Sequence, residues 1–417
     1  MEEKQVTSPA LGLFQGFGFE LEYMIVDRGT LAVRPFADRV LRDSTGRVTD
    51  ELEQGRIAWS NELVMHVIEL KTNGPVPGYD RLGETFSDSV RHLNRMLEPY
   101  DAMLLPTGMH PFMDPARETA LWPYEGREIY RAYDRIFNCR RHGWANLQSI
   151  HLNLPFADDR EFARLHAAVR LVLPIIPALA ASTPLVEGRL SGVADTRLEA
   201  YRANQAMVPS ISGLVVPEAL FSRAAYEEGI LAKISRDIAP CDPEGVFKSE
   251  WLNSRGAIAR FDRNTIEIRL IDIQECPAMD IAVSAAVICA VRALAEERFA
   301  PACRQMERDT DSLAAILAGV IREGERFLIR DQGYLDMFDA GSREMDAGEL
   351  IRMLVSRLAG LYGEMAAHLP ALELIGAHGT LSSRIVRSLG GDVSRESIDR
   401  VYRALARCLN DNTAFLP

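Results

Sequence analysis

The chain of 417 residues contains little lysine and carries an excess of acidic side chains. Only four of its 47 basic residues are lysines, namely Lys4, Lys71, Lys233 and Lys248, and the net charge is −12. Nucleic-acid backbones and anionic membrane surfaces repel so acidic a protein. We therefore expect no nucleic-acid partner, and any anionic substrate has to be held by local cations.

The sequence also lacks paired cysteines. Its six cysteines form no C-x-x-C motif, which makes a zinc site unfavourable. Cys276 and Cys289 lie in apolar surroundings. Such positions are typical of reduced, buried thiols in a reducing compartment.

Long uninterrupted apolar runs are missing as well. The most apolar stretch, residues 165–186, contains Arg170 and three prolines, which predicts a kinked or broken buried helix and not a membrane span. The amino-terminus is polar and acidic and shows no signal-peptide pattern. We expect a cytoplasmic protein without a membrane partner.

What remains has the composition of a soluble globular protein, with 47% apolar and 25% charged residues. Apolar alternation predicts strands within residues 16–26, 62–70, 102–106, 145–154 and 265–273, and residues 27–58 are predicted to be rich in loops. Helical spacing predicts helices over 80–100, 161–182, 279–299, 310–323, 346–368, 380–388 and 394–408. The pattern indicates an α+β fold, in which a mainly antiparallel or mixed sheet is backed by helices and a helical carboxy-terminal part packs on it.

Two acidic residues alternate on the first of these strands. Apolar side chains occupy one face of residues 16–26 at period two, so Glu20 and Glu22 project together from the other face. Two carboxylates about 7 Å apart on a rigid strand repel each other unless a positive charge lies between them. A divalent cation would supply that charge. The alternative is an ordinary solvated face of an antiparallel strand.

Three further segments place ionisable or polar side chains on otherwise apolar strands. The side chains of these segments are Glu62 and Glu69, then His151 and Asn153, then Glu267 and Arg269. Together with the first strand they supply five glutamates and one histidine with almost no lysine, which is unusual for a solvated face. If they share one sheet, they form an oxygen-rich surface suited to Mg²⁺ or Mn²⁺.

Each segment also has a simpler explanation. Glu62 and Glu69 are seven residues apart, so an unbroken strand would place them on opposite faces; either a bulge or bend intervenes, or Glu62 is a surface residue. His151 could be a hydrogen-bonded sheet histidine. Glu267 and Arg269 could belong to a set of cross-strand ion pairs.

These segments resemble, in order, the motifs of the glutamate–cysteine ligases and related carboxylate–amine ligases. The resemblance covers about residues 15–295, and its motifs are Gly18–Glu22, Glu62–Thr72, Gly108–Phe112, Ser149–Asn153, Ala181–Gly188 with Tyr201 and Arg202, and Arg263–Arg269. It implies a glutamine synthetase-like fold with the active site on a curved antiparallel sheet. It further implies residues 12–300 as the catalytic domain and 301–417 as a helical region packed on it, either separate or part of the same domain.

The resemblance implies a reaction as well. ATP would convert the γ-carboxylate of glutamate, or of a similar acid, into an acyl phosphate that an amine such as cysteine attacks. By motif, the Mg²⁺ ligands would be Glu20, Glu22, Glu62, Glu69, His151 and Glu267. The groups that bind phosphate or substrate would be Asn153, Arg202, Arg263 and Arg269, with Glu267 and Arg269 closest to the chemistry.

Physical chemistry agrees with this implied role. Phosphoryl transfer depends mainly on positioning and charge neutralisation, and metal ions allow an acidic pocket to accept a polyanion such as ATP. Arg269 would add bidentate phosphate recognition. Two alternatives remain: a kinase-like phosphoryl transferase without an amine step, and a catalytically silent relative that binds a nucleotide or an amino acid. The sequence does not identify the amine and leaves a homo-oligomer open.

Overall fold

The computed structural model describes residues 10–417. Lys4 and the polar amino-terminal residues in which no signal peptide is predicted lie outside this range. One eight-stranded sheet forms the centre of the structure, and all of its strand pairings are antiparallel. Its strands are β1 (Gly18–Asp27), β2 (Glu51–Gln54), β3 (Ile57–Asn61), β4 (Val67–Thr72), β5 (Ala102–Leu105), β6 (Ser149–Pro155), β9 (Ala257–Arg260) and β10 (Thr265–Asp272).

The sheet runs in the order β2-β3-β4-β1-β6-β10-β9, so the first strand of the chain lies near its middle. Residues 20–24 of β1 pair with β4, residues 18–21 pair with β6, and residues 24–27 pair with β5. Because Leu21 pairs with both β4 and β6 while Met24 pairs with both β4 and β5, β5 and β6 follow one another along the same edge of β1. This arrangement confirms the predicted α+β class with a mainly antiparallel sheet.

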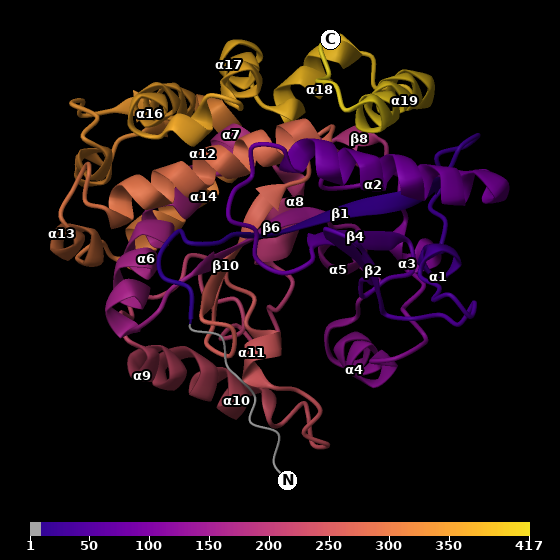
Figure 1. Ribbon diagram of the computed structural model, residues 1–417, viewed down its shortest axis with the longest axis horizontal. Helices are drawn as coiled ribbons and strands as arrows, with labels where there is room; N and C mark the ends of the chain where they lie inside the picture. The colour runs from indigo at the N-terminus through magenta and orange to yellow at the C-terminus, as the bar shows by residue number, and fades with distance from the viewer. Residues whose placement is uncertain (1–9) are drawn as a thin grey trace.

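Helices cover the apolar face of the sheet. Phe19, Leu21, Tyr23 and Ile25 of β1 are fully buried, and Figure 1 shows α2 and α12 lying along β1 on this side. The helices before residue 300 are α1 (Ala37–Val40), α2 (Leu82–Leu97), α3 (Pro115–Glu118), α4 (Arg127–Phe137), α5 (His142–Ala145), α6 (Asp159–Val172), α7 (Pro177–Ala180), α8 (Thr196–Arg202), α9 (Arg223–Tyr226), α10 (Ala232–Ile238), α11 (Ser249–Leu252) and α12 (Pro277–Ala295).

The apolar segment around residues 165–186 is broken, as predicted. The helix α6 ends at Val172, a 3₁₀ turn with Pro174 follows, and Pro177 begins the short helix α7. The buried Arg170 donates its Nε hydrogen to the Pro217 carbonyl at 2.8 Å. Within residues 10–417, one helix, α12, is long and apolar enough to cross a membrane, and most of it is buried inside the fold.

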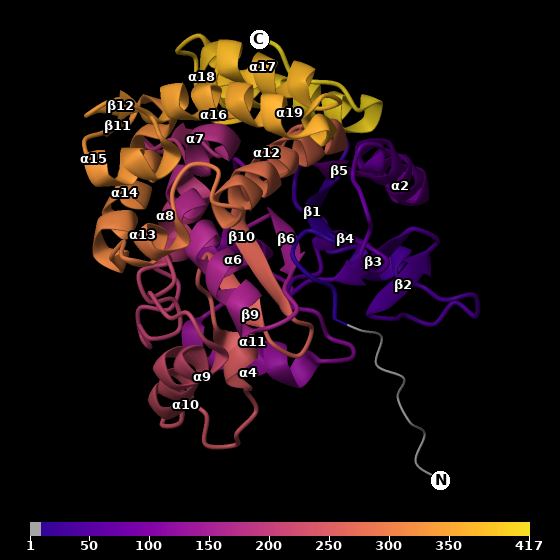
Figure 2. The same ribbon diagram turned by 60° about the vertical axis from the view of Figure 1, so that its left-hand side comes forward.

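The chain after residue 300 is helical, with two short strands, β11 (Leu328–Ile329) and β12 (Met345–Asp346), that pair with each other. Figure 2 shows α16, α17 and α18 lying above α7 and α12. The helices of this part are α13 (Ala302–Met306), α14 (Thr310–Glu323), α15 (Gln332–Leu335), α16 (Ala347–Leu361), α17 (Leu369–His378), α18 (Leu381–Leu389) and α19 (Arg395–Asp411). One hydrophobic core contains residues from both sides of residue 300, and the division into 12–300 and 301–417 stays a prediction.

Two local features differ from the predictions. Part of the region predicted to be rich in loops, residues 27–58, forms β2 and the start of β3. The strand predicted over 62–70 begins only at Val67, because the chain reverses direction between β3 and β4. A second small sheet joins β7 (Leu185–Val186) and β8 (Arg189–Leu190).

Candidate active site on the polar face of the sheet

The register of the central strands brings the predicted acidic residues together. Glu22 of β1 lies opposite Glu69 of β4, and Glu20 lies opposite His151 of β6. On the next pair of strands, Glu267 of β10 lies opposite Asn153. Cross-strand partners project from the same face of a sheet, so these side chains share the face opposite the hydrophobic core.

The position of Glu62 follows from the hairpin formed by β3 and β4. Ser60 pairs with Glu69 across the hairpin, and Glu62 follows two residues later, where alternation returns the chain to the same face. Carboxylate oxygens of Glu22, Glu62 and Glu69 lie within 4.8 Å of one another. Of the two alternatives for Glu62, a surface residue or a bend that brings it to the face of Glu69, the structure has the bend, which is the connection of this hairpin.

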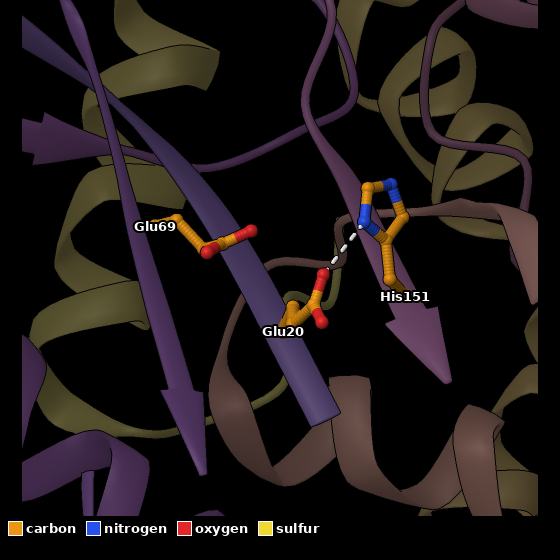
Figure 3. Close-up of side chains that lie close together, drawn as sticks. All are labelled: Glu20, Glu69 and His151. Carbon is orange, nitrogen blue, oxygen red and sulfur yellow. Dashed lines mark hydrogen bonds and ion pairs between the residues drawn. The ribbon is translucent and has the colours of Figure 1, made fainter. Parts of the chain in front are cut away.

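A second group of possible metal ligands adjoins the first. One ligand atom from each of Glu20, Glu69 and His151 lies within 4.8 Å of the other two, and Figure 3 shows the three side chains on neighbouring strands. His151 Nδ1 lies 3.0 Å from Glu20 Oε2, and its Nε2 lies 3.0 Å from Ser149 Oγ. Because Glu69 belongs to both groups, the two form one continuous cluster.

Glu267 has a different environment from the other carboxylates. It is buried, and its two oxygens lie 3.0 Å from Arg260 Nε and 3.1 Å from Arg269 Nε. Within residues 10–417 it belongs to neither cluster of possible metal ligands. The structure thus places Glu267 on the predicted face, in an ion-pair set with two arginines, and its role as a metal ligand stays a prediction.

The electrostatics of the cluster leave its carboxylates incompletely neutralised. Burial and the charges of Glu20 and Glu22 raise the pKa of Glu69 to about 7, although Lys71 and Ser60 oppose the shift. Burial and the charges of Glu22 and Glu69 raise the pKa of Glu62 well above its usual value. For Glu20, burial is outweighed by His151, Lys71 and Arg269, so its pKa falls to about 2. A divalent cation beside these oxygens would favour all of the ionised forms.

These pKa shifts predict that Mg²⁺ stabilises the protein more at about pH 8 than at about pH 5.5. The pKa of Glu69 is 4.5 in the unfolded chain and about 7 in the metal-free fold. The metal-free fold therefore loses roughly 3 kcal/mol of stability as the pH rises from the first value to the second. Mg²⁺ bound beside Glu69 would remove this cost. Thermal unfolding in chelator-treated buffer, with and without Mg²⁺, measures the difference.

The matched variant for this experiment is Glu69→Gln. Its amide cannot ionise, so the metal-free protein should lose less stability between the two pH values than the wild type does. Equal Mg²⁺-induced shifts of the wild-type melting temperature at both pH values would contradict the prediction.

Two cavities border the cluster. One, of about 420 Å³, is lined by Glu20, Lys71 and Asn153, with the exposed Arg263 at its rim. The other, of about 280 Å³, is lined by Glu22, Glu62, His151, Arg197 and Arg269. The acidic cluster therefore lies between the two cavities and is reached from both.

The helix α8 brings a further arginine to this site. Arg202, a predicted site residue at the end of α8, is exposed, pairs with Glu199 at 3.1 Å and does not line the smaller cavity. Arg197 and Tyr201, one helical turn apart, line it instead. Arg197 is buried and paired with Asp272, and within residues 10–417 its Nη2 atom has no hydrogen-bond partner.

Sequence reasoning missed Arg197 and its partner Asp272. The register of β10 shifts between Ile268 and Ile271, which marks a β-bulge. In an unbroken strand Asp272, five residues after Glu267, would lie on the opposite face. The bulge places it on the polar face instead. A sequence signal existed for α8: Asp195 precedes Arg197 as a helix N-cap, accepting a hydrogen bond from the Leu198 amide at 2.8 Å. That cap sets the face on which Arg197 and Tyr201 lie together.

Solved ligases have this fold. A bifunctional glutathione synthetase from Pasteurella multocida superposes with a TM-score of 0.59 at 16% identity, covering 96% of this chain and 52% of that one. A glutamate–cysteine ligase from Francisella tularensis, solved in complex with AMP, superposes with a TM-score of 0.57 at 14% identity, covering 96% and 93%. The chain thus spans about half the length of the Pasteurella protein. At these identities the likeness concerns the fold alone.

Residues 16–404 match the model of glutamate–cysteine ligase family 2, and the chain belongs to that family. An uncharacterized protein of Archaeoglobus fulgidus is 34% identical over 402 residues, which are 96% of this chain and all of that protein. A Rubrobacter xylanophilus protein named "Putative glutamate--cysteine ligase 2-3" is 29% identical over 291 residues, 68% of this chain and 70% of that one. The predicted family is confirmed, and family and fold together indicate a ligase that joins a carboxylate to an amine.

Proposed function

We propose that this protein is an ATP- and Mg²⁺-dependent ligase that activates the γ-carboxylate of glutamate, or of a similar acid, for attack by an amine. The observation that carries the proposal is the cluster of Glu20, Glu22, Glu62, Glu69 and His151 between two cavities. In the proposed reaction a carboxylate oxygen attacks the γ-phosphorus of ATP and ADP leaves. The amine nitrogen then attacks the acyl carbon, and phosphate and a proton are released.

The donor set of the cluster suits a hard divalent cation. Four carboxylates and one imidazole, two of them with pKa values that burial and mutual repulsion raise, offer oxygen-rich coordination of the kind that Mg²⁺ and Mn²⁺ prefer. When bound, such ions neutralise the phosphate charge of ATP. The residues of this chain hold the ions on a rigid sheet, since each ligand comes from a hydrogen-bonded strand or hairpin.

The basic side chains that line the two cavities support a different ligand for each cavity. We assign the nucleotide to the larger cavity, where Asn153 and Arg263 can contact its phosphates. We assign the acid to the smaller cavity, where Arg197 and Arg269 offer guanidinium groups. The Nη2 atom of Arg197 without a protein partner would then donate to a substrate carboxylate. Arg269, fixed against Glu267, would face the transferred phosphoryl group.

The experiment that tests this function is a phosphate-release assay on the purified chain. With ATP, Mg²⁺ and glutamate, we expect phosphate release that depends on one or more amines from a panel containing cysteine and other small amines. Phosphoryl transfer that needs no amine would favour the kinase-like alternative. Tight ATP binding by calorimetry without turnover on any acid or amine would favour the silent relative.

A pair of variants on α8 serves as the internal comparison for this assay. Arg197→Gln should raise the KM for the acid by about tenfold or more, because a charged hydrogen bond to a carboxylate contributes roughly 1.5–3 kcal/mol. Arg202→Gln, one helical position beyond Tyr201 and exposed, should change it little. If Arg202→Gln raises the KM for the acid more than Arg197→Gln does, Arg202 is the substrate-binding residue, as the family resemblance implies.

A further inference from the structure

A third cavity, of about 550 Å³, lies among the carboxy-terminal helices and shares no lining residue with the two cavities at the sheet. Its walls come from the β7–β8 segment, the 3₁₀ turn Gly324–Arg326, α16, α17 and α18. Figure 2 shows α16, α17 and α18 together at the top of the molecule, above α7. Its volume lies within the range of small-molecule sites.

Four arginines from different elements line this cavity. Arg322 lies in the last turn of α14, Arg326 lies in the 3₁₀ turn, Arg352 lies on α16 and Arg387 lies near the end of α18. Within residues 10–417, no carboxylate oxygen lies within 4.0 Å of their guanidinium nitrogens.

Some arginines of the same helical region have acidic partners. Arg330 lies 3.6 Å from Glu344, and Arg357 lies 3.5 Å from Asp339. All four of these arginines are exposed, and Arg387 also donates a hydrogen bond to the His378 carbonyl. What distinguishes them is that they line one cavity together, without a carboxylate partner, in a chain with a net charge of −12.

The one acidic side chain in the lining, Glu325, is engaged elsewhere. Its Oε2 accepts a hydrogen bond from the Thr380 hydroxyl at 3.2 Å, and its Oε1 accepts one from the Ser383 hydroxyl at 2.5 Å. These bonds hold the first turn of α18 against the 3₁₀ turn. Glu325 thus stabilises the wall of the cavity and leaves the guanidinium groups without a carboxylate partner.

We propose that this cavity binds a small polyanion carrying phosphate or carboxylate groups. Planar guanidinium groups match both kinds of oxyanion with paired hydrogen bonds, and several positive charges that line one cavity favour the binding of an anion. The site is distinct from the proposed active site, whose two cavities border the acidic cluster.

The cavity nevertheless adjoins the helix that carries Arg197. Its lining residue Ala194 donates its amide hydrogen to the Arg322 carbonyl at 3.0 Å, and the next amide, of Asp195, donates to the Ile321 carbonyl at 3.0 Å. Asp195 then caps α8. One wall of the basic cavity thus continues directly into an element of the proposed active site.

The test is calorimetric titration of the full chain with pyrophosphate and with citrate in buffer freed of divalent cations. Removing Mg²⁺ weakens the binding of both probes beside the acidic cluster, and the variants show which cavity accounts for the binding that remains. We expect at least one probe to bind with a Kd below about 1 mM. Arg352→Gln combined with Arg387→Gln should weaken that binding at least tenfold. Arg269→Gln, at the sheet, should leave it unchanged.

The matched control is Arg304→Gln combined with Arg343→Gln, which removes two exposed arginines outside the cavity. Binding of pyrophosphate alone would assign a phosphate ligand, and binding of citrate alone a polycarboxylate. The proposal is overturned if neither probe binds, if the control pair loses as much affinity as the cavity pair, or if only Arg269→Gln abolishes binding. Should the cavity pair fail to fold by circular dichroism, Arg322→Gln combined with Arg326→Gln replaces it.

Discussion

Replacing Glu267 with glutamine is expected to lower kcat/KM for amine-dependent phosphate release by about 10²–10³-fold, the usual effect of removing one group that organises charge in an active site. The wild-type carboxylate is buried, and its oxygens lie 3.0 Å from Arg260 Nε and 3.1 Å from Arg269 Nε. The amide has nearly the same shape but no charge, so it can neither hold both guanidinium groups nor act as the predicted metal ligand. Steady-state kinetics measure the loss.

A control variant on the same sheet shows whether the loss of activity is specific to Glu267 or follows from the loss of any carboxylate. Glu53→Gln changes an exposed carboxylate on β2 that lines neither cavity at the sheet, and it should leave kcat/KM within about twofold of wild type. Melting temperatures of both variants show whether the fold is intact. Activity of Glu267→Gln close to that of the wild type would remove Glu267 from the catalytic machinery.

The parts of the site that the sequence predicted are those that depend on local alternation. Glu20 with Glu22, His151 with Asn153, and Glu267 with Arg269 are each two residues apart on one strand. A period of two is a property of the strand itself, so the shared face is fixed before any tertiary contact forms. The alternation does not show how the strands pair with one another. The family resemblance implied that their polar faces lie side by side.

The parts that the sequence did not predict depend on interruptions of that alternation. Glu62 reaches the cluster only because β3 and β4 form a hairpin, and Asp272 reaches Arg197 only because β10 has a bulge. A local clue to the first existed, since the large apolar residues Ile57 and Trp59 alternate with the small residues Ala58 and Ser60. The bulge leaves no comparable mark, because its residues, Arg269 and Leu270, are compatible with an unbroken strand.

The ion pairs around Glu267 illustrate a second limit. Arg260 lies on β9, and it reaches Glu267 because β9 and β10 form a tight hairpin that turns at Asn264. Asn264 adopts a φ of 50°, in the left-handed region that asparagine tolerates better than most residues. Each of these residues can be read from the sequence, but which arginine neutralises Glu267 depends on the pairing of β9 with β10.

The second large effect is expected on stability, at an ion pair that joins the sheet to the carboxy-terminal helices. Glu275, just after β10, and Arg384 on α18 have fully buried side chains that pair with each other. The Phe415 amide donates to Glu275 Oε1 at 3.0 Å, and Arg384 donates to the Phe415 carbonyl at 2.7 Å. Removing one partner of such a pair leaves a buried charge, so Glu275→Gln should lower the free energy of unfolding by about 3–5 kcal/mol.

Urea unfolding followed by circular dichroism measures this loss, with Glu84→Gln as the control. Glu84 belongs to an exposed ion pair with Arg81, so that change should cost less than about 1 kcal/mol. A double variant, Glu275→Leu with Arg384→Met, should recover part of the stability, because no buried charge is then left without a partner. A loss for Glu275→Gln no larger than that of the surface control would contradict the prediction.

The same unfolding curves also test the predicted division at residue 300, because the Glu275–Arg384 pair crosses it. If residues 12–300 and 301–417 fold as one unit, Glu275→Gln shifts a single cooperative transition and leaves its steepness unchanged. If residues 301–417 form a domain of their own, two transitions appear. The variant then moves chiefly the transition of the less stable part, since the buried pair is lost as soon as either partner unfolds. A hydrophobic core that contains residues from both parts favours the single transition.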